Sequence, residues 1–122
     1  MIGNPLTLGG GGSGAVKMDL LWTNPDPTVN FAAQSIGVDI RSYDAVLVFY
    51  MFSLTTTRAM SCLAPTSATG LMLYCVYDTS STQGGRQATF VSGDISFDVG
   101  HTATATDAPA FAVPTAVYGV KF

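Results

Sequence analysis

The sequence predicts an all-β domain, an antiparallel β-sandwich of jelly-roll-like form with about eight short strands. The first reason is the run Ala45–Ser53, which contains no charge, Gly or Pro and is too β-branched and aromatic for a helix. The second is the recurrence of turn signals at intervals of about ten residues. The third is the scarcity of Glu, Lys, Gln and Arg, the residues that fill exposed helix faces.

Composition favours a subunit of an assembly. Charged residues make up 11% of the 122-residue chain, against about 25% in typical globular domains. Sparse charge promotes association, so we expect neighbours to cover much of the surface. The net charge of −3 comes without a basic cluster, so we expect no nucleic-acid partner. We also expect no membrane partner, because the longest apolar run is too short to span a bilayer.

Residues 1–16 are expected to form a flexible Gly-rich N-terminal arm, followed by the β-sandwich domain at 17–122. The run Gly9–Gly14 contains only Gly and one Ser, and such a segment cannot hold structure alone. It therefore acts as a connector between the domain and a short apolar segment that a partner would order. The candidate anchors of this assembly arm are Ile2, Pro5, Leu6 and Leu8. A laboratory linker is the alternative explanation for the Gly run.

Two strands are predicted before the apolar run. Residues 18–23 form the first, in which the single tryptophan, Trp22, is interpreted as a core anchor, with sugar stacking as the alternative. The prolines at 25 and 27 end this strand. Residues 34–40 alternate between apolar and polar or small side chains, which predicts a second, half-buried strand. Tyr43 and Asp44 then lead into the apolar run.

We expect Ala45–Ser53 to be the central strand and to be buried on both faces, because both alternating sets of side chains are apolar. Such a strand is packed within a sandwich or between subunits. Residues 58–64 and 71–77 are predicted to follow as a hairpin. The two cysteines, Cys62 and Cys75, fall within these strands. They are interpreted as buried thiols, with a disulfide across the hairpin as the alternative.

Three further strands are predicted toward the C-terminus. Residues 87–91 and 94–99 form two strands joined by a turn at Ser92-Gly93. Residues 115–122 alternate and close the fold. The stretch 101–108 is expected to be an edge strand or a loop.

Residues 78–87 form the longest polar segment, and loops of this kind carry recognition in β-sandwiches. Its candidate contact residues are Asp78, Ser80, Gln83 and Arg86.

No residue pattern predicts catalysis, a cofactor or a metal site, so we expect a protein that is not an enzyme. The single histidine, His101, lies in a Thr- and Ala-rich stretch and is interpreted as a solvated loop residue. Cys62 and Cys75 lack partners at zinc-binding spacing. Asp94 and Asp98 are four residues apart, and we interpret them as surface carboxylates, with a calcium site or a glycosidase pair as the alternatives.

Several short motifs bracket residues 21–122. They are residues 21–27 (LWTNPDP), 31–34 (FAAQ), the alternating Ile36, Val38, Asp39 and Ile40, then Tyr43 and Asp44, and finally residues 114–121 (PTAVYGVK). In these motifs the chain resembles a family of small β-modules found in bacteriophage tail-fibre and other minor virion proteins. The motifs mark turns and strand ends, so they carry little information about a ligand. Such modules tend to end a long fibre protein, whereas here a short Gly-rich arm precedes the module.

The resemblance implies a non-enzymatic virion structural protein, either a capsid decoration or minor capsid protein or a tail-appendage subunit. Its partners would be copies of itself, in a homo-oligomer expected to be a trimer, and other virion proteins. It would be made in the host cytoplasm, since no secretory signal is visible, and would reside in the virion capsid or tail. The alternative is a carbohydrate-binding module of a tail fibre or tip that recognises a host surface glycan.

Overall fold

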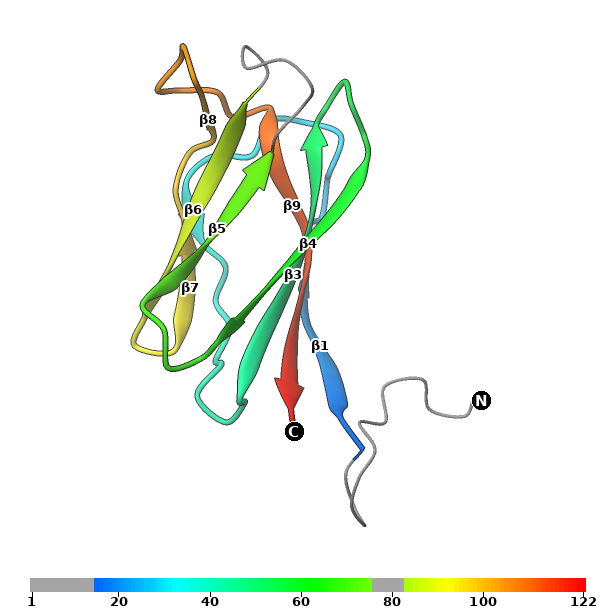
Figure 1. Cartoon of the computed structure of the whole chain (residues 1–122), viewed down its shortest axis with the longest axis vertical. Coiled ribbons are helices and arrows are strands. Elements are labelled where there is room, and N and C mark those ends of the chain that lie inside the picture. Colours follow the sequence, from blue (N-terminus) through cyan, green and yellow to red (C-terminus); the bar gives the residue numbers. More distant parts are fainter. Residues whose placement is uncertain (1–14, 76–82) are drawn as a thin grey trace.

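The computed structural model describes residues 15–75 and 83–122, which form two antiparallel sheets packed face to face (Figure 1). One sheet has the strand order β1 (Lys17–Thr23), β9 (Phe111–Lys121), β3 (Ala45–Ser53), β4 (Ala59–Pro65). The other has the order β2 (Gln34–Ser35), β7 (Asp94–Phe97), β6 (Gly84–Val91), β5 (Gly70–Cys75), and β8 (His101–Thr102) also pairs with β6. The predicted β-sandwich is confirmed, while its jelly-roll form stays a prediction. Within the described ranges no helix is long and apolar enough to cross a membrane.

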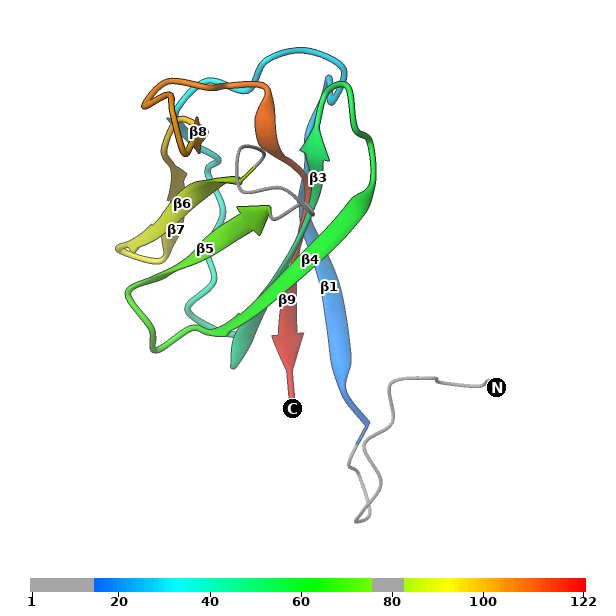
Figure 2. The same ribbon diagram turned by 45° about the horizontal axis from the view of Figure 1, so that its top comes forward.

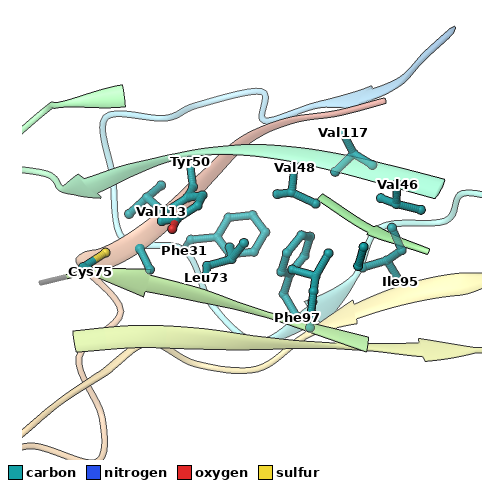
Figure 3. Packing of buried hydrophobic residues seen from close by; sticks show 14 of the residues in the cluster. Phe31, Val46, Val48, Tyr50, Leu73, Cys75, Ile95, Phe97, Val113 and Val117 are labelled. Atoms are coloured by element: carbon teal, nitrogen blue, oxygen red, sulfur yellow. The ribbon is translucent and has the colours of Figure 1, made fainter. Parts of the chain in front are cut away.

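Strand β3 has the predicted bounds and lies between β9 and β4 in its sheet. Its even-numbered side chains, among them Val46, Val48 and Tyr50, point between the sheets and are buried (Figure 3). Within the single chain only one face of β3 is fully buried, because Leu47 and Phe49 on the other face remain partly exposed. Burial of that other face between subunits stays a prediction. The second sheet covers only one side of β3, and no other described element packs on its outer side (Figure 2).

The core between the sheets contains a cluster of three aromatic rings. The Trp22 ring lies 5.8 Å from the Phe31 ring and 6.1 Å from the Phe97 ring, and the Phe31 and Phe97 rings meet edge to face at 5.7 Å. Such contacts stabilise beyond the burial of area alone. Trp22 is therefore a core anchor, as interpreted from the sequence.

The predicted strand at residues 34–40 is mostly wrong, since only Gln34–Ser35 pairs as β2. Gly37 has a φ of 74°, which interrupts the extended backbone. The backbone amides of Gly37 and Val38 donate instead to the Asp94 carboxylate, at 3.0 and 2.9 Å. The apolar alternation still orients side chains correctly, because Ile40 is buried in the core.

The predicted hairpin between the fourth and fifth strands is also wrong. Strand β4 pairs with β3, and β5 pairs with β6 in the opposite sheet. The short connection between them therefore crosses the sandwich from one sheet to the other (Figure 1). Cys62 on β4 and Cys75 on β5 are free thiols, half-buried and buried respectively, so the disulfide alternative does not hold.

The predicted turn at Ser92-Gly93 is confirmed. These two residues have φ values of 51° and 84°, which suit a two-residue hairpin loop, and Val91 pairs directly with Asp94. The last strand begins at Phe111, four residues earlier than predicted. Pro114 lies next to a register shift in the pairing of β9 with β3, a place where a strand tolerates proline.

Candidate interaction surfaces

The outer side of the β1-β9-β3-β4 sheet carries three rows of side chains that run across its strands. The middle row is formed by direct cross-strand partners, with Leu20 opposite Tyr118, Tyr118 opposite Leu47, and Leu47 opposite Leu63. Residues two positions along each strand point the same way and form the flanking rows. In β1 the step from Leu20 to Thr23 is three positions, because the pairing with β9 shifts register between Leu20 and Trp22. The twelve residues are Met18, Val120, Ala45 and Pro65, then Leu20, Tyr118, Leu47 and Leu63, and then Thr23, Ala116, Phe49 and Ser61.

We call these twelve residues the uncharged face, because none of them is Asp, Glu, Lys, Arg or His. Leu20 and Leu63, at the two ends of the middle row, are 54% and 59% exposed. Between them the rings of Phe49 and Tyr118 meet edge to face, with centroids 5.7 Å apart. In the flanking row from Met18 to Pro65, Ala45 and Val120 are only 3% and 4% exposed, so the exposed apolar surface centres on the middle row. An exposed apolar row of this kind is typical of a protein contact site.

Cationic side chains lie at the strand ends that border the uncharged face. Lys17 and Lys121 are exposed neighbours at one end, and the exposed Arg58 precedes β4 at the other. An apolar centre with a charged margin is the usual anatomy of a protein interface.

The outer side of the second sheet is mixed in chemistry, since its exposed side chains include Met72, Tyr74 and Val91 beside polar residues. Its comparable row is polar, with Ser35 opposite Ser96 and Ser96 opposite Thr89. A shallow depression of about 490 Å³ lies there, lined by these residues together with Gln87 and others. The two outer sides of the sandwich therefore suit different partners.

Tyr74, near the end of β5, is an aromatic ring on this side and is 51% exposed. Its hydroxyl lies 3.5 Å from the side-chain oxygen of Gln83. An exposed ring beside amide and hydroxyl groups is the combination that binds sugars by stacking and hydrogen bonding.

The predicted recognition loop is only partly visible, since Asp78 and Ser80 lie outside the described residues. Gln83 is half-buried and directly precedes β6. The prediction is wrong for Arg86, which lies within β6 and has no solvent-exposed surface. The Gly84-Gly85-Arg86 sequence looks like a loop, but it pairs with β5 and β8.

The guanidinium of Arg86 donates five hydrogen bonds to backbone carbonyls. They reach the oxygens of Ala112, Phe31, Asp98, Pro109 and Phe111 at 2.7–3.0 Å. Arginine has five N–H donors, so the group is fully satisfied without a carboxylate partner. Burial lowers the pKa of Arg86 to about 10. The side chain ties the start of β9 and the segment before it to the backbone at Phe31 and at Asp98, and is therefore structural.

The remaining candidate residues from the sequence do not come together in one site. His101 is half-buried on β8, Asp94 binds backbone amides, and Asp98 is exposed and accepts from the amide of Val99. Within residues 15–75 and 83–122 no group of three or more His, Cys, Asp or Glu residues could hold a metal ion. The arm anchors Ile2, Pro5, Leu6 and Leu8 lie outside the described residues.

Sequence reasoning missed the uncharged face. The available signal was that alternate positions in the strands are apolar on both sides, as in Leu47 and Phe49 of β3. The strand pairing could not be inferred from the sequence. In the structure β9 lies between β1 and β3 and brings Tyr118 between Leu20 and Leu47. The sequence matches no family model and no curated protein.

Proposed function

We propose that this protein is a non-enzymatic structural protein of a bacteriophage virion, a capsid decoration or minor capsid protein or a tail-appendage subunit. It assembles through its β-domain and its N-terminal arm, with copies of itself and with other virion proteins. The observation that carries this proposal is the uncharged face, in which Leu20, Tyr118, Leu47 and Leu63 form one row across a whole sheet.

The face supports an assembly role because its exposure has a cost in a free monomer. Leu20 and Leu63 are both more than half exposed, and the row between them is apolar. Burying such area against a partner is favourable by about 25 cal/mol per Å². The low charge content of 11% agrees with a surface that neighbours cover. The motif resemblance to phage β-modules supplies the virion context.

The test is the protein content of purified particles. Virions of the phage that encodes the chain are banded on a density gradient, separated into capsid and tail fractions, and analysed by quantitative mass spectrometry. We expect the chain at a fixed stoichiometry in one of the two fractions. Its absence from purified particles would contradict the proposal.

A second candidate function is carbohydrate binding at a host surface, and Tyr74 is the observation that favours it. The exposed ring lies beside Gln83 and on the same side as Gln87 and Thr89. These groups provide a stacking platform and hydrogen-bonding partners for sugar hydroxyls. The two roles are compatible, since a virion subunit can also bind the receptor.

Glycan-array binding by the purified protein tests this second role. We expect Tyr74→Ala to weaken binding of any glycan by about tenfold or more, since stacking is lost. Val29→Ala is the matched control, because it truncates an apolar side chain of similar exposure, 49%, in the segment between β1 and β2. A silent array, or equal binding by Tyr74→Ala, would exclude a glycan site centred on this ring.

A further inference from the structure

We propose that residues 4–8 of the N-terminal arm pair with the free edge of strand β1 of the same chain, as one more antiparallel strand of the first sheet. This inference goes beyond the proposed function, because it concerns the single chain and requires no virion. It names the surface that orders the apolar segment of the arm.

Strand β1 lies at the edge of its sheet, with β9 on one side (Figure 1). The Asn24 amide donates to the Thr115 carbonyl at 2.9 Å, so Thr115 turns its backbone groups toward β1. Every second residue of an antiparallel strand turns to the same neighbour. The β1 residues that bond to β9 are therefore the partners of Val117, Gly119 and Lys121.

The open edge of β1 presents the backbone groups of Met18 and Leu20. The partners of the β9 residues are Trp22, Asp19 and Lys17, so the residues between them point their N–H and C=O groups away from β9. No described strand lies on that side of β1. Such a row of backbone donors and acceptors is a template for one more strand.

The arm lies outside the described residues, and its sequence has the complementary pattern. Residues 4–8 (NPLTL) place leucines two positions apart. With Leu8 opposite Met18 and Leu6 opposite Leu20, both leucines lie on the outer side of the sheet, because opposed residues point the same way. Leu6 then covers the end of the middle row at Leu20, which is 54% exposed. Burial of this apolar area favours the pairing.

Pro5 selects the same alignment for a separate reason. Leu6 and Leu8 supply the amides and carbonyls that meet β1, so Pro5 points away from β1, where its missing N–H leaves no hydrogen bond unmade. A shift by one residue would place Pro5 opposite Leu20 and leave the Leu20 carbonyl without a donor. The backbone and the side chains of the arm therefore require the same parity of pairing.

The connection between the two strands favours pairing within one chain. Residues 9–17 separate Leu8 from Met18 and include the run Gly9–Gly14. Opposed residues in neighbouring strands lie only about 5 Å apart, and a loop of this length closes at a modest entropic cost. The tether holds the arm near β1 at an effective concentration on the order of 1 mM, above ordinary protein concentrations.

The pairing has a consequence for assembly. An open sheet edge pairs readily with strands of other molecules. With the arm in place, a strand of another molecule can reach β1 only by displacing it. Among the described strands of this sheet, β4 is then the edge that stays open.

The experiment is amide hydrogen exchange followed by NMR on the full-length protein and two proline variants. The amides of Met18 and Leu20 should exchange at least about tenfold more slowly in the parent than in Leu6→Pro, which removes an N–H that bonds to β1. Thr7→Pro is the matched control, because residue 7 points away from β1, and exchange should stay within about threefold of the parent. The Val48 amide, in the core strand, should be equally protected in all three proteins.

Three results would overturn the proposal. The first is exchange of the Met18 and Leu20 amides at the unprotected rate in the parent. The second is equal protection of these amides in Leu6→Pro and in the parent. The third is protection that appears only as the protein concentration rises from about 0.05 mM to about 1 mM, which would assign the arm to the β1 edge of another copy.

Discussion

At the scale of single residues, Arg86 shows how a buried charge can be accommodated without a counter-ion. Its five N–H groups all donate to backbone carbonyls, and the Phe31 ring lies 5.2 Å from its guanidinium carbon. Gly100 makes room for this arrangement, since a Cβ there would come within 3.1 Å of the guanidinium. The arginine thus sets the conformation of the loops at one end of the sandwich.

We expect Arg86→Met to destabilise the fold by on the order of 4 kcal/mol, because it leaves several buried carbonyls without a donor. Urea unfolding followed by circular dichroism measures this change. Arg41→Met is the control, since Arg41 forms only a surface ion pair with Asp39 and should change stability by less than about 1 kcal/mol. Equal stability of the two variants would show that the Arg86 contacts do not hold the loops.

A second prediction at the scale of single residues is that Cys75 makes the free energy of unfolding depend on pH. Burial raises the pKa of its thiol from the ordinary 9.0 to about 11. The unfolded chain therefore releases this proton near pH 9, while the folded protein keeps it. The stability from protonated Cys75 is complete below pH 9 and is lost as the pH rises toward 11.

Urea unfolding at about pH 8 and about pH 10.5, under reducing conditions, tests this dependence. We expect the parent to lose on the order of 1–2 kcal/mol more over this range than Cys75→Ala does. The comparison is needed because burial also raises the pKa of Tyr50 to about 12, and Tyr50 destabilises both proteins at the upper end of the range. Identical losses would rule out Cys75 as the source.

At the scale of elements, β3 determines how the first sheet is built. It pairs with β9 on one side and β4 on the other, and it alternates between fully buried and partly exposed side chains. Its inner side chains form the core and its outer ones form the centre of the uncharged face. One strand therefore serves both folding and the proposed assembly.

Val48→Asp should abolish folding, because Val48 is completely buried and an aspartate there would be an unpaired charge in the core. Such a change lowers the free energy of unfolding by more than about 4 kcal/mol. The whole free energy of unfolding of a typical protein is only about 5–15 kcal/mol. Circular dichroism and solubility measure the outcome. Leu63→Asp, on the neighbouring strand at 59% exposure, should remain folded. A soluble and folded Val48→Asp protein would refute the central placement of this strand.

At the scale of the whole molecule, the two outer sides of the sandwich differ in their central rows, although Met72 and Val91 are exposed apolar side chains on the second sheet. One carries the apolar row from Leu20 to Leu63, and the other carries the polar row from Ser35 to Thr89. This difference lets one side pack in an assembly while the other stays in contact with water or a ligand.

Association through an uncharged face should respond little to ionic strength. Raising NaCl from about 0.05 M to about 0.5 M shortens the screening length several-fold and weakens exposed ion pairs. We expect the self-association constant from sedimentation to stay constant or to rise. A marked weakening of self-association at high salt would mean that the contact is made by charged groups, such as those at Lys17, Lys121 and Arg58.

The sequence by itself determined the fold class, the bounds of β3, the Ser92-Gly93 turn and the core role of Trp22. Each follows from local physics: a nine-residue apolar run, two residues suited to positive φ, and a large apolar ring. Only the tertiary structure decided the strand pairing, the buried environment of Arg86 and the uncharged face. Those depend on contacts between residues far apart in the chain, as when Tyr118 comes to lie between Leu20 and Leu47, and no local pattern encodes such neighbours.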